Sequence, residues 1–241
     1  MGTIIARSGS YTIKYKKMKN VALCIVLTCS IAFSQEPITK NLGDFNTLKV
    51  YNGLTVEIQK SNVSTIEISG SQSEDVSVKN TNGILKIRLK FPDSFTAEDV
   101  RIVLNYTNDI GVLDANEGAQ IYSDEKINQQ HLEVKAQEGA RIDLTIDTKY
   151  LVVKSVSGGI IILNGKTENQ NAEVTTGGIY EAYDLESKQS IVTAASGASV
   201  EINAQETLDA KVRFGGSIYY KGTPEILKTK KVIGGTIKAM Y

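Results

Sequence analysis

Cysteine, histidine, proline and tryptophan are all scarce in this chain of 241 residues. It contains two cysteines, one histidine, three prolines and no tryptophan. Beyond Cys29 there is no further cysteine and a single histidine, His131, so the usual zinc ligand sets and a Cys–His catalytic pair cannot be assembled there. No G-x-S-x-G, phosphate-loop or dinucleotide fingerprint is present. We therefore predict no catalytic residue, no cofactor and no metal site.

An excess of basic charge is confined to the N-terminal segment, although the formal net charge of the chain is zero. Residues 1–34 carry five basic side chains and no acidic one, which leaves 22 basic against 27 acidic residues in the remainder, a net charge of −5. An acidic body without a basic face argues against nucleic acid as a partner, because that binding depends on neutralising phosphates.

The N-terminal segment has the pattern of an export signal. Lysines at 14, 16, 17 and 19 precede the apolar run 21–33, which is too short for a stable membrane span of about 20 apolar residues. We predict cleavage after Ser34, an upstream extension over residues 1–17 with Met18 as the start, and a mature domain over 35–241. Thr28 argues against lipid attachment at Cys29. The expected location is the periplasm, the outer-membrane surface or the medium.

Glycine recurs at a regular spacing in the second half of the chain. The first glycines of successive Gly-Gly or Gly-Ala pairs are separated by 21, 19, 19, 20, 18 and 19 residues, at positions 118, 139, 158, 177, 197, 215 and 234. Apolar residues follow most of these glycines at the third and fifth positions, which is the two-residue period of a strand with one buried face. Each repeat predicts a strand, a tight glycine turn, a second strand and a polar connector.

Such repeats are stable only when they are stacked. We predict an all-β, single-domain parallel β-helix (β-solenoid) with rungs of about 19 residues, in which each strand pairs with its counterparts at the ~4.8 Å strand spacing. The absence of a hexapeptide register favours a right-handed winding, as for parallel crossovers in general.

Residues 35–110 are also β but less regular than residues 111–241. Alternating segments are separated by turn signals, including Asn52-Gly53 and Asn82-Gly83, which are typical of hairpins. We predict irregular N-terminal rungs and hairpins that close the open end of the solenoid, with a loop at 91–95. No linker demands a second domain.

Carboxylates offer one alternative to a purely binding role. The outward position four residues after each glycine holds Glu181 and Glu201 on neighbouring rungs. Such a pair could bind calcium or share a proton, as in a polysaccharide-processing enzyme. The simpler interpretation is a solvated face, because the same positions also hold Asp143 and Lys238. His131 is expected to face outward or to lie in the connector, without a catalytic role.

An apolar group on the outside of the solenoid is the strongest candidate for contact with a partner. The repeat register directs Ile160, Ile162 and Ile179 outward, and Tyr219 belongs to the same sheet. Contiguous exposed apolar side chains usually mark an interaction surface. We predict that these four residues form an interaction face. Coverage by a loop or by the N-terminal segment is the other interpretation.

The pattern as a whole resembles the head GIN domain family of auto-transporter adhesins, which are exported β-helical proteins common in Bacteroidetes. The resemblance depends on residues 45–58, 196–200, 215–224 and 234–237, and it extends over nearly all of the chain after Asn41. It implies a non-catalytic adhesin or binding module for an envelope or cell-surface protein or glycan. It supplies no catalytic residues. A self-associating envelope component, which would form homo-oligomers, remains a further hypothesis.

Overall fold

The structure is a computed structural model that describes residues 36–90 and 99–240. These residues belong to one compact unit that is almost entirely β-structure. The predicted upstream extension, the export signal with Cys29 and its cleavage site, and the predicted loop at 91–95 all lie outside the described residues. Within the described ranges, no helix has the length and hydropathy needed to cross a membrane.

Two groups of strands follow one another along the chain. The N-terminal group contains one short 3-10 helix, η1 (Ser73–Asp75), and the strands β1 (Ile38–Asn41), β2 (Thr47–Val50), β3 (Thr55–Lys60), β4 (Thr65–Ser69), β5 (Val76–Thr81), β6 (Ile84–Leu89) and β7 (Arg101–Tyr106). The second group comprises β8 (Val112–Ala115), β9 (Gln120–Tyr122), β10 (Ile127–Gln137), β11 (Arg141–Val156), β12 (Ile160–Val174), β13 (Ile179–Ala195), β14 (Ser199–Arg213), β15 (Ser217–Lys221), β16 (Ile226–Val232) and β17 (Thr236–Ala239).

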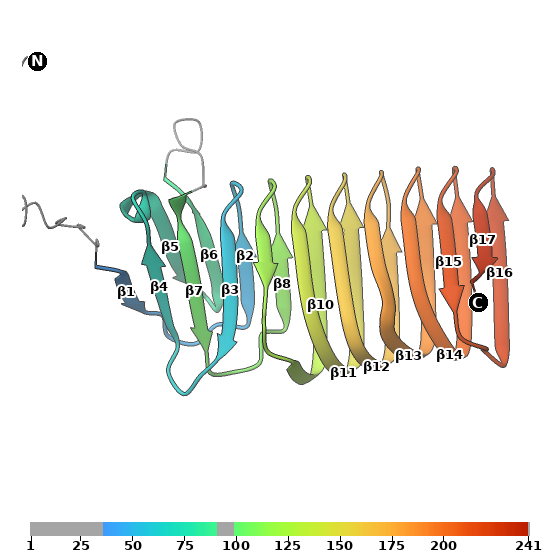
Figure 1. Cartoon of the computed structure of the whole chain (residues 1–241), viewed down its shortest axis with the longest axis horizontal. Helices are drawn as coiled ribbons and strands as arrows, with labels where there is room; N and C mark the ends of the chain where they lie inside the picture. Colours follow the sequence, from blue (N-terminus) through green and yellow to red (C-terminus); the bar gives the residue numbers. More distant parts are fainter. Residues whose placement is uncertain (1–35, 91–98, 241) are drawn as a thin grey trace, which may run out of the picture. The chain divides into compact units, whose positions relative to one another are not determined.

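The predicted β-solenoid is confirmed by the strand pairing. From β10 onward every pairing is parallel, and equivalent residues of successive repeats face each other, such as Ile142 with Ile161 and Ile161 with Tyr180. In Figure 1 the tight turns of these coils line one edge, and the long strands bend at the opposite edge. The right-handed winding stays a prediction.

The tight turns use the glycines that mark the repeat. At the turn between β11 and β12, both Ser157 (φ 52°) and Gly158 (φ 75°) are in the left-handed region, a combination typical of type I′ turns. The N–H of Gly158 donates to the carbonyl of Thr176 in the next coil, at 3.2 Å. Hydrogen bonds between successive coils therefore join the turns as well as the strands.

A second glycine is required by close packing between coils. A Cβ atom added at Gly159 would lie 2.1 Å from the carbonyl oxygen of Ala136 on the neighbouring coil. Real Cβ atoms do not approach a backbone oxygen so closely, so only glycine lets the two coils keep their spacing. This explains the Gly-Gly form of the repeat at this turn.

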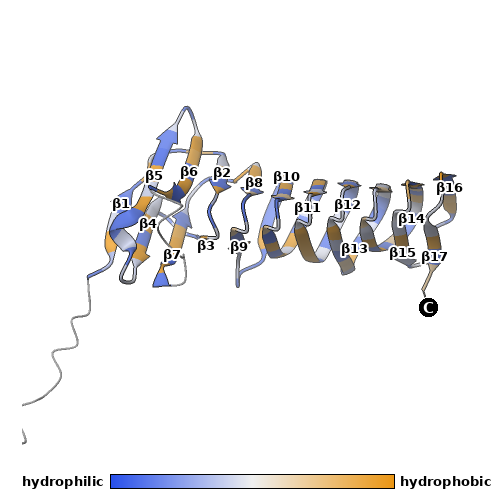
Figure 2. Ribbon diagram, turned by 90° about the horizontal axis from the view of Figure 1, so that it is seen from above, coloured by the Kyte–Doolittle hydropathy of each residue, from blue (hydrophilic) through white to orange (hydrophobic). Residues whose placement is uncertain are grey.

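The core is a set of ladders that run from coil to coil inside the solenoid. One ladder contains Ile121, Ile142, Ile161, Tyr180, Val200 and Ile218, all of which are buried. Figure 2 shows hydrophobic and hydrophilic residues alternating along the strands, as expected when one face of each strand is buried. Each buried aliphatic side chain stabilises the fold by roughly 1.5–3 kcal/mol relative to exposure.

The N-terminal strands do not stack in chain order, contrary to a simple series of rungs. The β2–β3 coil lies between the β6–β7 coil and the β8–β9 coil, because β2 pairs with both β6 and β8, and β3 with both β7 and β9. The strands β4 to β7 are thus stacked on one side of the β2–β3 coil, and β8 and β9 on its other side. As a result, the N–H of Gly53 donates to the carbonyl of Glu117 at 2.8 Å.

The two Asn-Gly turns have different roles. Asn82-Gly83 joins the antiparallel pair β5 and β6, so the predicted hairpin there is confirmed. The hairpin predicted at Asn52-Gly53 is wrong, because β2 and β3 do not pair with each other. Asn52 and Gly53 have the same left-handed backbone as the repeat turns and begin their stack. A local signal for two left-handed residues identifies the turn but not which strands it connects.

Candidate interaction face

The predicted interaction residues lie on the sheet that follows the tight turns. We call its outward surface, formed by residues 120–122, 141–145, 160–164, 179–183, 199–203, 217–221 and 236–239, the post-turn face. Ile160 pairs with Ile179, and Ile162 pairs with Glu181 on the next coil. Tyr219 follows two coils after Glu181, between Glu201 and Lys238. The structure therefore places all four predicted residues on one face.

The three isoleucines form an apolar strip on this face. Each of them is half-buried, because its neighbours along the sheet cover its flanks, while the fully buried Ile161 points to the core between two of them. On one side the strip is bordered by Arg141 and Asp143, whose side chains form an ion pair at 3.3 Å. The centre of the face is thus apolar and its border is polar.

Tyr183 is a member of this face that the sequence analysis missed. Its ring lies 4.4 Å from the ammonium of Lys221, and burial raises the pKa of its hydroxyl, with Glu201 and Tyr219 adding to the effect. Tyr183 stands six residues after Gly177, where strand alternation directs side chains outward. Extending the alternation past the fifth position would have found it.

Glu181 and Glu201 face each other on neighbouring coils, as predicted. Partial burial raises the pKa of Glu201, the adjacent Glu181 raises it further, and Lys221 offsets part of the change. Glu201 therefore favours its protonated form more than usual. Among the described residues, no group of three or more His, Cys, Asp or Glu side chains is arranged to hold a metal ion.

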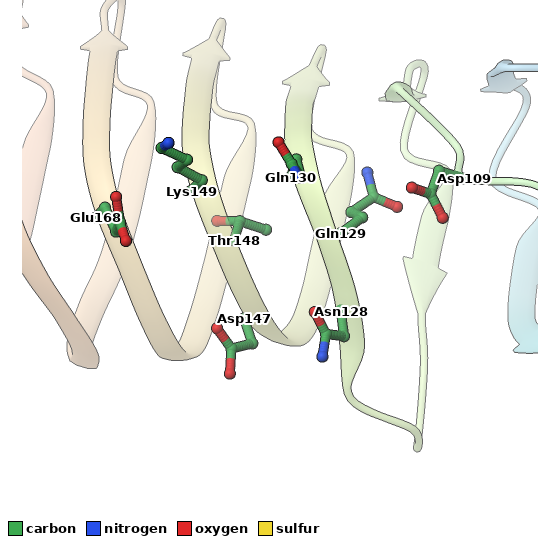
Figure 3. A pocket seen from close by; sticks show the side chains of 8 residues that line it. All are labelled: Asp109, Asn128, Gln129, Gln130, Asp147, Thr148, Lys149 and Glu168. Atoms are coloured by element: carbon green, nitrogen blue, oxygen red, sulfur yellow. The ribbon is translucent and has the colours of Figure 1, made fainter.

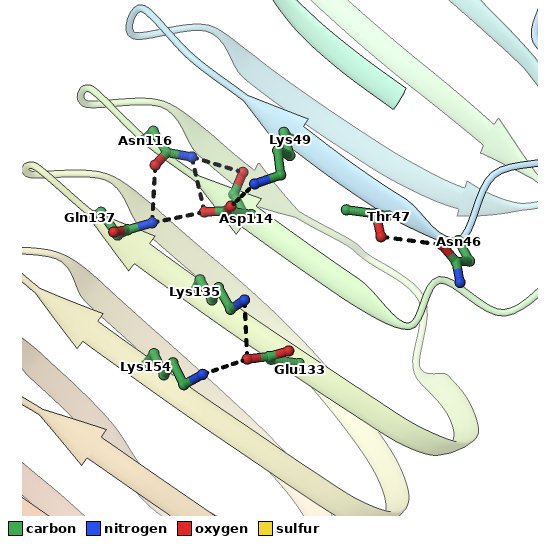
Figure 4. Close-up of polar contacts among 9 residues, drawn as sticks. All are labelled: Asn46, Thr47, Lys49, Asp114, Asn116, Glu133, Lys135, Gln137 and Lys154. Carbon is green, nitrogen blue, oxygen red and sulfur yellow. Dashed lines mark hydrogen bonds and ion pairs between the residues drawn. The ribbon is translucent and has the colours of Figure 1, made fainter. Parts of the chain in front are cut away.

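The sheet that precedes the tight turns has a different outward surface, in which charged groups pair with one another (Figure 4). Asp114 accepts hydrogen bonds from Lys49 and Asn116, both at 2.9 Å, and from Gln137 at 3.1 Å. These contacts tie β2, β8 and β10 together. The bond to Asp114 raises the pKa of Lys49.

Glu133 forms a second paired group on this surface. It lies 2.9 Å from Lys154 and 3.1 Å from Lys135. Burial alone would raise the pKa of Glu133, but the hydrogen bonds from the two lysines outweigh it and hold the pKa below its ordinary value. Asp114, Glu133 and the lysines around them are therefore paired within the chain, in contrast to the apolar strip of the post-turn face.

Comparisons with known proteins agree with this architecture. The family described as "Putative auto-transporter adhesin, head GIN domain" matches residues 44–224. The crystal structure of a "putative adhesin" from Bacteroides fragilis aligns with a TM-score of 0.75 and 20% identity, over 86% of this chain and 98% of that chain. A "putative adhesin" from Parabacteroides merdae aligns with a TM-score of 0.60 and 20% identity, over 86% and 97%.

A "putative lipid binding protein" from Parabacteroides distasonis shares the fold as well, with a TM-score of 0.62 and 17% identity over 86% of this chain and 98% of that chain. Similarity at these identities shows the fold alone. No curated protein matches the sequence. The family match extends over most of the chain and includes β2 to β15, all but the last of the tight turns, and most of the post-turn face described above. The chain therefore belongs to the head GIN domain family, whose description is that of an auto-transporter adhesin.

Proposed function

We propose that this protein is a non-catalytic, exported adhesion module that binds a partner at the cell surface through the post-turn face. The observation that carries the proposal is the outward apolar strip of Ile160, Ile162 and Ile179, which extends over neighbouring coils of a regular sheet. Solenoids commonly bind through such extended sheet faces. The adhesin description of the family supports a surface-exposed binding role.

The composition of the face favours a protein partner over a glycan at this position. Protein interfaces have an apolar centre, a polar rim and an enrichment in tyrosine and arginine. Here the isoleucines form the centre, Tyr183 and Tyr219 lie at one end, and Arg141 lies at the border. A glycan would instead require a surface rich in hydroxyl and amide groups.

The test is a binding screen with an envelope fraction of Bacteroides fragilis, purified envelope proteins and a glycan array. We expect the chain to bind a surface protein, and the triple substitution of Ile160, Ile162 and Ile179 by Ser to abolish that binding while the circular dichroism spectrum is unchanged. Val63→Ser is the matched control, because Val63 is 58% exposed in the loop between β3 and β4, away from the post-turn face. If the triple variant still binds the partner, the post-turn face is not the binding surface and the proposal is wrong.

Two further measurements on the same variants separate adhesion from the two alternatives. If the protein is a self-associating envelope component, light scattering will show an oligomer for the parent chain. The triple variant will then be a monomer. A polysaccharide-processing enzyme would release soluble sugar, and Glu181→Gln would abolish the release. Within residues 36–90 and 99–240, the raised pKa of Glu201 beside Glu181 is the feature that favours the enzyme, and we rank the enzyme below adhesion.

A further inference from the structure

A second candidate site lies on the opposite edge of the solenoid from the tight turns, where the strands bend. A groove of about 450 Å³ opens there over β10, β11 and β12 (Figure 3). A smaller groove of about 210 Å³ continues over the following coils. Tyr150 pairs with Asn169, and Asn169 with Gln189, so the two grooves belong to one row of side chains along the solenoid. We call this row, which begins at His131 and ends at Thr207, the polar corner.

Uncharged amide and hydroxyl groups belong to half of the residues that line the larger groove and to five of the eight that line the smaller one. Asn128, Gln130 and Thr148 line the larger groove, and Asn169, Gln189 and Thr207 line the smaller one. An amide offers both donors and acceptors, and a hydroxyl can act as either. This combination matches the hydroxyl groups of a sugar, each of which donates and accepts.

Two of the three carboxylates in the larger groove are paired with lysines of the chain. Asp109 lies 3.3 Å from Lys60, and Asp147 lies 3.8 Å from Lys126. The third carboxylate, Glu168, lines the groove together with the ammonium of Lys149. The lining of the larger groove holds three carboxylates and one ammonium, which disfavours an acidic polymer, while the lysines paired with Asp109 and Asp147 reduce the attraction for a basic one.

An aromatic surface completes the polar corner. The rings of His131 and Tyr150 are stacked with their centroids 4.9 Å apart and their planes at 14°. Tyr150 is 42% exposed, and its only further partner in the described residues is the exposed Lys149, with the ammonium 5.5 Å from the ring centroid. A flat, partly exposed ring provides the apolar surface against which the C–H face of a sugar packs.

We propose that the polar corner binds a neutral glycan chain that runs along the solenoid axis. Each coil adds about 4.8 Å to the row of side chains, so successive sugar units meet equivalent amide and hydroxyl groups on successive coils. The aromatic pair anchors one end of the chain. This site is separate from the post-turn face and does not depend on its proposed protein partner.

The single histidine makes the proposal directly testable, since the chain prepared without a histidine tag has one imidazole resonance pair. The probes are the neutral hexasaccharides maltohexaose, cellohexaose and mannohexaose. A broad array of neutral glycans is tested as well. A hexagalacturonate and a Gly-Ser peptide serve as the acidic and peptide probes. We expect a neutral glycan to bind and to shift the His131 imidazole signals in ¹⁵N-correlated spectra.

Substitutions locate the binding. Tyr150→Ala should weaken glycan binding about tenfold, through loss of ring contact. Phe214→Ala is the matched control, because it removes a ring that is 56% exposed at the tight-turn edge, and it should leave binding unchanged. Binding without an imidazole shift, undiminished binding by Tyr150→Ala, preference for the acidic or peptide probe, or no binding to any neutral glycan would each overturn the proposal. None of these outcomes depends on the apolar strip of Ile160, Ile162 and Ile179.

Discussion

The regular coils after residue 111 and the N-terminal strands before it solve the same packing problem in different ways. In the regular coils every strand pairs in parallel with the strand one repeat away, so stability is the sum of similar nearest-neighbour contacts. In the N-terminal region the chain reverses, and antiparallel pairs such as β5–β6 and β4–β7 are added at the end of the stack. The comparison shows that the N-terminal end of this solenoid is closed by a change of strand direction.

The two ends of the solenoid differ accordingly. Val76 of β5, at the N-terminal end, is only 2% exposed, whereas Ile226 and Leu227 of β16, at the other end, are 53% and 45% exposed. Among the described strands, β16 pairs only with β14. Three lysines on β16 place charge on this edge, which is a common way to oppose edge-to-edge aggregation.

The largest expected effect comes from disturbing the contact between coils in the regular region. Gly159→Ala should destabilise the protein by roughly 3 kcal/mol, because the new Cβ would strike the carbonyl of Ala136 on the adjacent coil. Gly158→Ala meets no atom within 4 Å and should cost only about 1 kcal/mol for its left-handed backbone. Urea denaturation measures both. Equal losses would mean that turn strain, and not coil spacing, requires the second glycine.

A smaller effect is expected where the two regions meet. Asp114→Ala should cost about 2 kcal/mol, because Lys49, Asn116 and Gln137 lose a nearly buried acceptor. Asp143→Ala is the matched control, since its ion pair with Arg141 is about 40% exposed and is worth about 0.5 kcal/mol. The pKa of Lys49 is raised on folding, so its contribution is full at all pH values below about 10.4 and is lost only above that. Urea denaturation at pH 7 therefore includes the full contribution of Lys49. A loss of stability in Asp114→Ala no larger than that in Asp143→Ala would contradict the proposed hydrogen-bond network around Asp114.

The smallest of these effects is the pH dependence carried by Glu133 within the regular coils. Its pKa is lowered on folding, so its stabilisation is present above about pH 4.3 and is lost as the pH falls through the lower folded value. Glu133→Gln should remove up to about 1 kcal/mol at pH 7 and flatten the stability profile below pH 4.5. Thermal unfolding between pH 3 and 7 tests this. A variant with the same profile as the parent chain would show that the two lysines act only as surface charges.

The sequence predicted the regular region well because each turn and each ladder position is repeated at nearly constant spacing. Ile142, Ile161 and Tyr180 could be aligned by counting from the glycines alone. The return of the chain past β2 and β3 could not be predicted, because the contact between Gly53 and Glu117 joins residues 64 positions apart without a local signal. The polar corner was missed for a related reason, since it forms where strands bend and the alternation of side chains is interrupted.

The central claim is that the post-turn face is the surface that contacts the partner. Hydroxyl-radical footprinting of the chain, free and bound to the strongest protein binder of the screen, tests it most directly. We expect Ile160, Ile162 and Tyr219 to become less reactive toward hydroxyl radicals on binding. The reactivity of the exposed Ile191 on the other sheet should not change. Unchanged reactivity at Ile160 and Ile162, with protection at Ile191 instead, would contradict the account.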